Sequence, residues 1–264
     1  FLFHKKATRH FFTVYEEFEK IIQIVVAKGL KKRYNYNWIK FEFYINNNTE
    51  SGGLQMSNSA KLSARERIES LVDANSFVEI GGMITKRNTD FNMQEKAVPA
   101  DGVITGYGVV NSNLVYIYSQ DVTALNGSVG EMHAKKIAGI YEMAMKAGAP
   151  VIGLIDCAGI RVQEAMDALA GFGDIYMAKV NASGVIPQIS AVLGSCGGGV
   201  AISSKLGDIT IIEKTNGKLF VNSPNAIAGN RIEKCDTSDA AFQAECGNAD
   251  IVCENEQEVF TTIR

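Results

Sequence analysis

Two short runs of small residues carry the chemistry that this sequence could perform. Residues 156–161 read DCAGIR and residues 194–199 read GSCGGG, and each run follows an apolar segment and precedes a helix-like one. At such positions backbone N–H groups lack helix partners, and small side chains let a ligand approach them closely. Two loops of this kind at neighbouring strand ends could aim two donors at one oxygen, which is the geometry of an oxyanion hole.

Other interpretations of these loops remain open from the residues alone, and a tight turn after each strand is the simplest. The second run is not a phosphate-binding loop, because no Gly-Lys-Ser/Thr ends it. It lacks the dinucleotide motif because Cys196 stands where a glycine is needed, and it lacks the nucleophile elbow because Leu193 precedes Gly194. A thiol–imidazole pair of Cys157 or Cys196 with His133 is conceivable, although a lone histidine is more often structural or solvated.

The elements that must position these loops alternate between strand-like and helix-like segments. Short apolar runs at residues 151–155 and 187–193 are typical of strands buried on both faces. We expect helices over residues 130–147 and 162–182, and a capping box beginning at Ser63 predicts another through Leu71. Further strands are predicted at residues 76–80, 101–110, 114–120, 209–213 and 218–221. This strand-strand-helix rhythm indicates an α/β protein.

Composition excludes several classes of function. The chain has 264 residues, 46% of them hydrophobic, and a net charge of -3, so no basic surface for nucleic acid is expected. No apolar run approaches the roughly 20 residues that span a bilayer. The five cysteines form no CxxC pair, so a zinc site is not expected and the thiols should be reduced, as in a cytoplasmic protein.

The composition changes near Met56. Residues 1–55 contain seven of the thirteen Phe and the only Trp, but no Met, Pro, Asp or Cys. One interpretation is a helical N-terminal extension, because residues 11–26 have an amphipathic pattern. The interpretation that we favour is a non-native extension translated from upstream DNA, with Met56 as the natural start. Residues 56–264 then form one domain, which contains all the strand-like and helix-like segments named above.

Several motifs together resemble the carboxyltransferase subunits of biotin-dependent acyl-CoA carboxylases, transcarboxylases and acyl-CoA decarboxylases. The resemblance begins after Met56 and extends over most of the remaining chain. It is specific only as a set: KLSARERI at 61–68, ADGVITGYG at 100–108, SQD at 119–121, GSVGEMHAKKI at 127–137, GAPVIGL at 148–154 and SGVIPQIS at 183–190. The final stretch, residues 236–264, is a weaker match.

The resemblance implies a crotonase-like fold of stacked strand-strand-helix repeats with acyl-CoA bound at two backbone amides. The family pattern DSGGARIQEG corresponds to DCAGIRVQEA at 156–165, and GPCAGG corresponds to GSCGGG at 194–199. The implied catalytic donors are the N–H groups of Gly159, Ile160, Gly197 and Gly198. Ala158 and Gly199 are implied to contact the substrate, and Ala158 and Ile160 replace smaller family residues.

The implied reaction is carboxyl transfer between carboxybiotin and an acetyl-, propionyl- or methylmalonyl-type acyl-CoA, with the thioester enolate held by backbone amides. Alternatives are the alpha subunit of a biotin-linked decarboxylase in a sodium-pumping complex and an inactive acyl-CoA-binding fragment. The implied partners are a biotin carboxyl carrier protein, a biotin carboxylase or membrane decarboxylase subunit, further copies of the chain, and a C-terminal carboxyltransferase half, because the chain corresponds to the N-terminal domain only. Arg161 and Glu164 are expected to form a local cap and ion pair.

Overall fold

The computed structural model describes residues 61–88, 98–222 and 236–264. The chain divides into two units, Phe1–Lys61 and Leu62–Arg264, and the second contains the described helices and strands. The helix expected over residues 11–26 lies outside the described residues. The proposed start at Met56 also lies outside them and stays a prediction.

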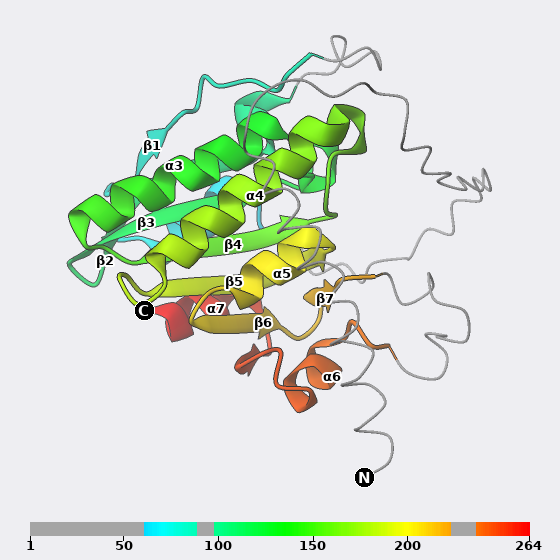
Figure 1. The fold of residues 1–264 in the computed structure, drawn as a ribbon. Coiled ribbons are helices and arrows are strands. Elements are labelled where there is room, and N and C mark those ends of the chain that lie inside the picture. The colour runs from blue at the N-terminus through cyan, green and yellow to red at the C-terminus, as the bar shows by residue number, and fades with distance from the viewer. Residues whose placement is uncertain (1–60, 89–97, 223–235) are drawn as a thin grey trace. The chain divides into compact units, whose positions relative to one another are not determined.

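One mixed sheet organises the described unit (Figure 1). Its strand order is β1-β2-β3-β4-β5-β6-β8, and β7 pairs with the end of β5. The first three strands are antiparallel neighbours, whereas β3, β4, β5, β6 and β8 pair in parallel. The strands are β1 (Val78–Ile80), β2 (Val103–Val110), β3 (Asn113–Gln120), β4 (Val151–Cys157), β5 (Gln188–Gly197), β6 (Ile209–Glu213), β7 (Lys218–Phe220) and β8 (Ile251–Cys253).

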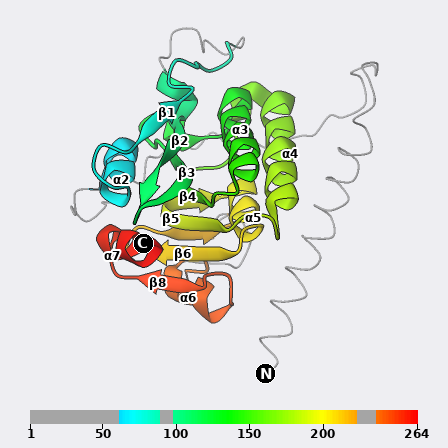
Figure 2. The ribbon, with the colours of Figure 1, turned by 90° about the vertical axis from the view of Figure 1, so that its left-hand side faces the viewer.

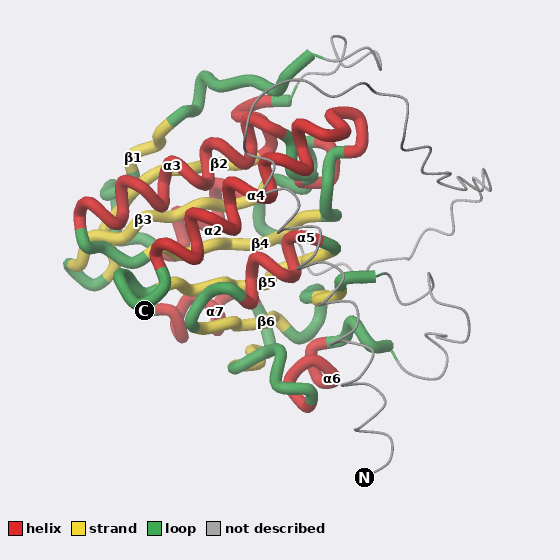
Figure 3. The backbone as a smooth tube through the Cα atoms, viewed as in Figure 1, coloured by secondary structure: helices red, strands yellow, loops and turns green. Residues whose placement is uncertain are grey.

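Helices cover both faces of this sheet, as Figure 2 shows edge-on. α3 and α4 pack side by side on one face, whereas α2 and α7 lie on the other and contact each other. In Figure 3 the strands form the central layer between these helices. The helices are α2 (Ala64–Leu71), α3 (Glu131–Ala147), α4 (Ala165–Ala182), α5 (Gly199–Lys205), α6 (Ala240–Glu245) and α7 (Glu256–Ile263).

Local sequence explains where the main elements begin and end. The predicted capping box is present at α2, where the Ser63 hydroxyl accepts from the Glu66 amide and the Glu66 carboxylate accepts from the Ser63 amide. Helix α3 ends at Gly148, whose φ of 67° is the left-handed conformation that glycine adopts without strain. Every residue of β4 is buried, as expected for a parallel strand covered on both faces. Apolar side chains of α2, α7 and the central strands, including Ile68, form one core cluster.

The structure corrects three of the predicted boundaries. The second glycine run is not wholly a loop, because residues 194–197 belong to β5, where β7 pairs with their backbone. The strand expected from residue 101 starts at Val103, since Pro99–Gly102 form a 3-10 turn. The helix expected from residue 162 begins with a separate 3-10 turn, Val162–Glu164. The elements after residue 236 were not predicted.

Candidate functional site

The two glycine runs lie together at the carboxyl ends of β4 and β5. These strands are parallel neighbours, and Cys157 faces Cys196 in their register. Their backbones are close: a Cβ atom added at Gly197 would lie 3.0 Å from the carbonyl oxygen of Ala158, and one added at Gly159 would lie 3.3 Å from the carbonyl oxygen of Gly197. The prediction that the two runs meet at one edge of the sheet is therefore confirmed. The contact also explains why larger residues would be crowded at Gly159 and Gly197.

In the first run, the backbone around Ile160 forms a single parallel bridge with Val129. The Val129 amide donates to the Gly159 carbonyl at 2.9 Å, and the Arg161 amide donates to the Val129 carbonyl at 2.9 Å. In such a bridge the central residue's own N–H points away from its partner, so the Ile160 amide is directed away from Val129. The neighbouring Gly159 amide faces only the Cys157 sulfur, at 3.3 Å. Of the two predicted donors here, Ile160 has the orientation that a ligand-binding amide needs.

In the second run, the Gly198 amide differs from its predicted role. It donates to the carbonyl oxygen of Phe220 on β7 at 2.9 Å, so it is already engaged within the protein. The first amide of a helix has no intrahelical acceptor, which places the Gly199 amide at the start of α5 as the next donor along the chain. Gly198 has φ 61° and ψ -128°, a conformation that L-residues rarely adopt, and an added Cβ there would meet no described atom within 4 Å. Gly198 thus provides a turn next to open space.

The thiols beside the loops are unsuited to act as nucleophiles. Cys157 and Cys196 are free, with no exposed surface. Burial raises the pKa of the Cys157 thiol to about 12 and moves the pKa of Cys196 upward as well, so both stay protonated near neutral pH. Cys253 is also a free buried thiol, and the reduced state of all five cysteines stays a prediction. Cys235 lies outside the described residues.

His133 is a structural residue and does not pair with either thiol. Its ring is fully buried on α3, with Nδ1 3.0 Å from the Asp101 carbonyl oxygen and Nε2 3.2 Å from the Gln120 side-chain amide. Nδ1 must therefore donate to the carbonyl while Nε2 accepts from the amide. Burial, aided by the positive charge of Arg161, lowers the pKa of His133 to about 3. The neutral imidazole serves the packing of the turn that precedes β2.

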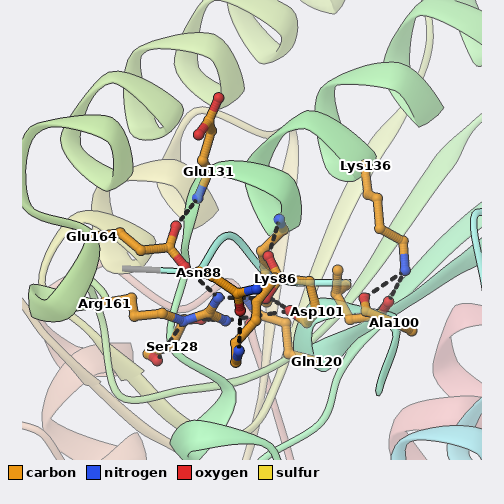
Figure 4. A network of polar contacts seen from close by, with 12 residues as sticks. Lys86, Asn88, Ala100, Asp101, Gln120, Ser128, Glu131, Lys136, Arg161 and Glu164 are labelled. Carbon is orange, nitrogen blue, oxygen red and sulfur yellow. Dashed lines mark hydrogen bonds and ion pairs between the residues drawn. The ribbon is translucent and has the colours of Figure 1, made fainter. Parts of the chain in front are cut away.

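A buried ion cluster supports the first loop (Figure 4). The Arg161 guanidinium has no exposed surface and contacts both Asp101 and Glu164, the latter at 2.9 Å. Its Nη2 donates to the Ser128 carbonyl at 2.7 Å. The expected local ion pair of Arg161 with Glu164 is confirmed. Asp101 is a third member that sequence reasoning missed.

The carboxylates of this cluster also cap α3. Glu164 accepts from the Glu131 amide at 2.7 Å, and Asp101 accepts from the His133 amide at 2.7 Å. Two of the amides left without partners in the first turn are thereby satisfied by negative charges, which also suits the helix dipole. Burial raises the pKa of Asp101 although Arg161 opposes that shift. The cluster fixes Arg161, the residue immediately after Ile160.

Lys136 secures the turn that carries Asp101. Its Nζ donates to the Ala100 carbonyl at 2.7 Å and also to the carbonyl of Val103. Ala100 and Asp101 both have left-handed φ, 51° and 53°, a conformation that costs non-glycine residues energy. Burial lowers the pKa of Lys136 to about 8. The Asp101–Gly102 pair is typical of turns, so the sequence does contain a signal for this turn. The prediction of a strand from residue 101 overlooks that signal.

Within residues 61–88, 98–222 and 236–264, no three His, Cys, Asp or Glu side chains are grouped so as to hold a metal ion. Among the same residues, no helix combines the length and apolar character needed to cross a membrane.

A layered α/β fold with two glycine runs meeting at adjacent strand ends defines a protein of the crotonase-like class. Within that class the chain belongs to the carboxyl transferase domain family, which matches residues 55–264. It is 42% identical over 208 residues to the methylmalonyl-CoA decarboxylase subunit alpha of Veillonella parvula, and 42% identical over 214 residues to the propionyl-CoA carboxylase beta chain of Roseobacter denitrificans. Each comparison covers 77% of this chain and 41% of the relative, so the chain spans less than half the length of these proteins.

Solved structures agree with this assignment. Transcarboxylase 12S, described as a hexamer with hydrolysed methylmalonyl-coenzyme A bound, matches with a TM-score of 0.74 and 35% identity, covering 77% of this chain and 40% of that one. A Pseudomonas malonate decarboxylase hetero-tetramer matches with a TM-score of 0.67 and 26% identity, covering 76% of this chain and 80% of that one. These relatives are therefore parts of multi-subunit enzymes.

Proposed function

We propose that this chain is the acyl-CoA-binding half of a biotin-dependent carboxyltransferase, in which backbone amides stabilise the enolate of the thioester. The observation that supports it most is the meeting of the two glycine runs, with the Ile160 amide directed away from its bridge to Val129. The second donor comes from residues 197–199, where Gly199 replaces Gly198 as the favoured amide. Ala158 is exposed beside them and is proposed to contact the substrate.

The reaction places negative charge on the thioester oxygen when the α-carbon gains or loses its carboxyl group. Fixed amide donors stabilise that charge without titrating, and losing one such donor costs about 3 kcal/mol of barrier. Carboxybiotin, carried on a separate protein, would supply the carboxyl group in one direction, and biotin would accept it in the other. The residues of this chain bind the thioester, orient its carbonyl and hold the developing oxyanion. The neutral thiols of Cys157 and Cys196 take no part.

The substrate is an acetyl-, propionyl- or methylmalonyl-type CoA thioester, and the propionyl-CoA carboxylase relatives support the carboxylating direction. The decarboxylating direction is a second candidate, because alpha subunits of methylmalonyl-CoA decarboxylases from Veillonella parvula and Propionigenium modestum are 42% and 46% identical to the chain. A membrane decarboxylase subunit would be the partner in that case, and a biotin carboxylase in the other.

Further partners follow from the same proposal. A biotin carboxyl carrier protein must deliver the carboxyl group, and a C-terminal carboxyltransferase half completes the active site. The malonate decarboxylase chain that is 80% covered is part of a hetero-tetramer, which supports a separate polypeptide as the source of that half. Several copies of the chain would assemble in the cytoplasm.

The amide role is tested by removing one N–H. Ile160→Pro deletes the donor, whereas Ile160→Val keeps it with a side chain of similar shape. Binding of propionyl-CoA and methylmalonyl-CoA to the full chain, measured by calorimetry, should weaken for Ile160→Pro by about tenfold, the effect of a lost hydrogen bond to a polar ligand. Ile160→Val should bind like the parent. Equal binding by the two variants would remove Ile160 from the site.

The second loop has its own matched pair. Gly198→Ala and Gly148→Ala each place a Cβ on a glycine of positive φ with no described atom within 4 Å, so both incur backbone strain. Only Gly198→Ala should reduce acyl-CoA affinity. The strain at Gly198 also means that the bulkier Gly198→Val would destabilise the fold as well as block the site. Cys196→Ser should leave binding unchanged, and a loss of turnover in that variant alone would favour a thiol mechanism.

A further inference from the structure

The ladder between β4 and β5 changes register immediately before the candidate site. Ile155 faces Val192, but Cys157 faces Cys196, so β5 advances four residues while β4 advances two. Backbone groups of the additional β5 residues lose their regular ladder partners over this irregularity and need others, because they are buried. The position of residues 196–199 relative to residues 158–160 depends on how this irregularity is held.

Asp156 and Arg67 supply partners at this point. One carboxylate oxygen of Asp156 accepts from the Ser195 amide at 3.2 Å, and the other accepts from Nη1 of Arg67 at 3.1 Å. Nη2 of Arg67 points to the Leu193 carbonyl at 3.4 Å. The side chains of Arg67 and Asp156 are each 1% exposed, so these contacts are shielded from water. One guanidinium therefore joins the end of β4 to the additional residues of β5.

Helix α7 fixes the other side of the same guanidinium. Nε and Nη2 of Arg67 both donate to a single oxygen of Glu256, Oε1, at 3.2 and 2.6 Å. Oε2 of Glu256 is buried and has no hydrogen-bond partner among the described residues. Arg67 belongs to α2 and Glu256 to α7, which lie on the face of the sheet opposite α3 and α4 (Figure 2).

We propose that Arg67, Asp156 and Glu256 form a positioning clamp that sets the distance between the two glycine runs, and with it the spacing of the amides that would hold the enolate. The functional part of this inference rests on the proposed function. The contact it controls is tight, because Gly197 and Ala158 leave only 3.0 Å for an added Cβ. The guanidinium reaches Asp156, Glu256 and the Leu193 carbonyl from three nitrogen atoms in a fixed plane, whereas lysine would have to reach them from one nitrogen atom.

Because both bonds from Arg67 go to one oxygen of Glu256, substitutions of Glu256 can test the clamp. Glu256→Gln retains an oxygen in the place of Oε1 and can keep both bonds to Arg67, whereas Glu256→Ala removes them. Amide hydrogen exchange of the full chain, followed by mass spectrometry, should show about tenfold faster exchange in residues 193–199 for Glu256→Ala. Glu256→Gln should stay within about twofold of the parent, and peptides of α3 and α4 should be unchanged in both.

Arg264→Lys is the matched control. Arg264 also joins the end of α7 to the end of α2, through the Leu71 carbonyl at 2.7 Å and Asp73 at 2.6 Å, but its side-chain hydrogen bonds go to neither β4 nor β5. Its replacement should leave exchange in residues 193–199 unchanged. Equal acceleration by Arg264→Lys and Glu256→Ala would overturn the clamp and indicate general loosening of α7. Arg67→Lys should accelerate exchange in residues 193–199 as Glu256→Ala does. If Arg67→Lys does not fold, the comparison of Glu256→Ala with Glu256→Gln tests the clamp without it.

Binding of methylmalonyl-CoA by calorimetry connects the clamp to the site. Glu256→Ala should weaken binding by about five- to tenfold, the effect of a displaced hydrogen-bond donor, with Glu256→Gln and Arg264→Lys like the parent. Local acceleration of exchange with unchanged affinity would overturn the positioning role. If the parent chain itself binds no CoA thioester, the proposed function fails, and the exchange pattern still decides whether the clamp holds the strand ends.

Discussion

Two buried arginines, Arg161 and Arg67, each contact two carboxylates near the candidate site, but the two clusters serve different elements. Arg161 joins Asp101 and Glu164, all three without exposed surface. Arg67 joins Asp156 and Glu256, and the latter is 12% exposed. In the Arg161 cluster the carboxylates accept hydrogen bonds from amides at the start of α3. In the Arg67 cluster Asp156 accepts a hydrogen bond from the Ser195 amide, where β5 changes register.

An arginine with two carboxylates thus provides hydrogen-bond acceptors for the first amides of a helix in one cluster, and for an amide at a sheet irregularity in the other. A helix always leaves its first amides without partners, so the Arg161 cluster serves a need that any helix has. The change of register occurs between β4 and β5, so the Arg67 cluster affects how the ends of these two strands lie relative to each other. We therefore expect the first cluster to control stability more than binding, and the second to control binding more than stability.

The largest effect is expected from Arg161→Met. This change keeps most of the side-chain volume but leaves Asp101 and Glu164 buried without their cation, which should cost about 3 to 5 kcal/mol of unfolding free energy. Urea denaturation of the full chain measures it. Arg87→Met is the control, because Arg87 also contacts two carboxylates, Glu131 and Asp167, but is 48% exposed. That change should cost about 1 kcal/mol or less, and similar losses for both variants would contradict the comparison.

A second effect, on the Arg161 side, is expected from pH. His133, which faces Arg161, Lys136 and Asp101, has a folded pKa of about 3 against an ordinary value of 6.5. The unfolded chain therefore binds the additional proton, and the stability is complete above pH 6.5 and is lost as the pH falls toward 3. The slope should approach about 1.4 kcal/mol per pH unit below 6.5.

His133→Gln isolates this effect, because glutamine can donate to the Asp101 carbonyl and accept from Gln120 without titrating. Urea denaturation at pH 7 and pH 5 should show a smaller loss of stability in the variant than in the parent. Identical pH dependence in both proteins would show that His133 is protonated in the fold and would weaken the assigned hydrogen-bond pattern.

The smallest effect is expected from removing residues 1–55. Both arginine clusters lie in the unit Leu62–Arg264, and the family match begins at residue 55. A chain that starts at Met56 should therefore melt within a few degrees of the full chain in a thermal scan. Substitutions in either arginine cluster should cost the same free energy of unfolding in the truncated chain as in the full chain. Loss of folding on this truncation would contradict the interpretation of residues 1–55 as a non-native extension.

The parts of the fold that sequence predicted are those with a local signal. Helix α3, strand β6 and the capping box at Ser63 follow from periodicity and capping residues, and the two glycine runs were recognised by their small residues after apolar strands. The engaged amide of Gly198 was missed because its acceptor, Phe220, belongs to another strand. Glu256 was missed for the same reason, since 189 residues separate it from Arg67.

The change of register between β4 and β5 has a consequence for insertions and deletions. The surplus in β5 is two residues, an even number, so Cys157 and Cys196 still face each other with their side chains on one side of the sheet. Removing both surplus residues would shorten β5 but would leave its later side chains on the same faces of the sheet. Removing one would turn every later side chain of β5 to the opposite face, exposing the buried thiol of Cys196 to the helices of the other layer. Differences in the length of β5 within this family should therefore occur here in steps of two residues.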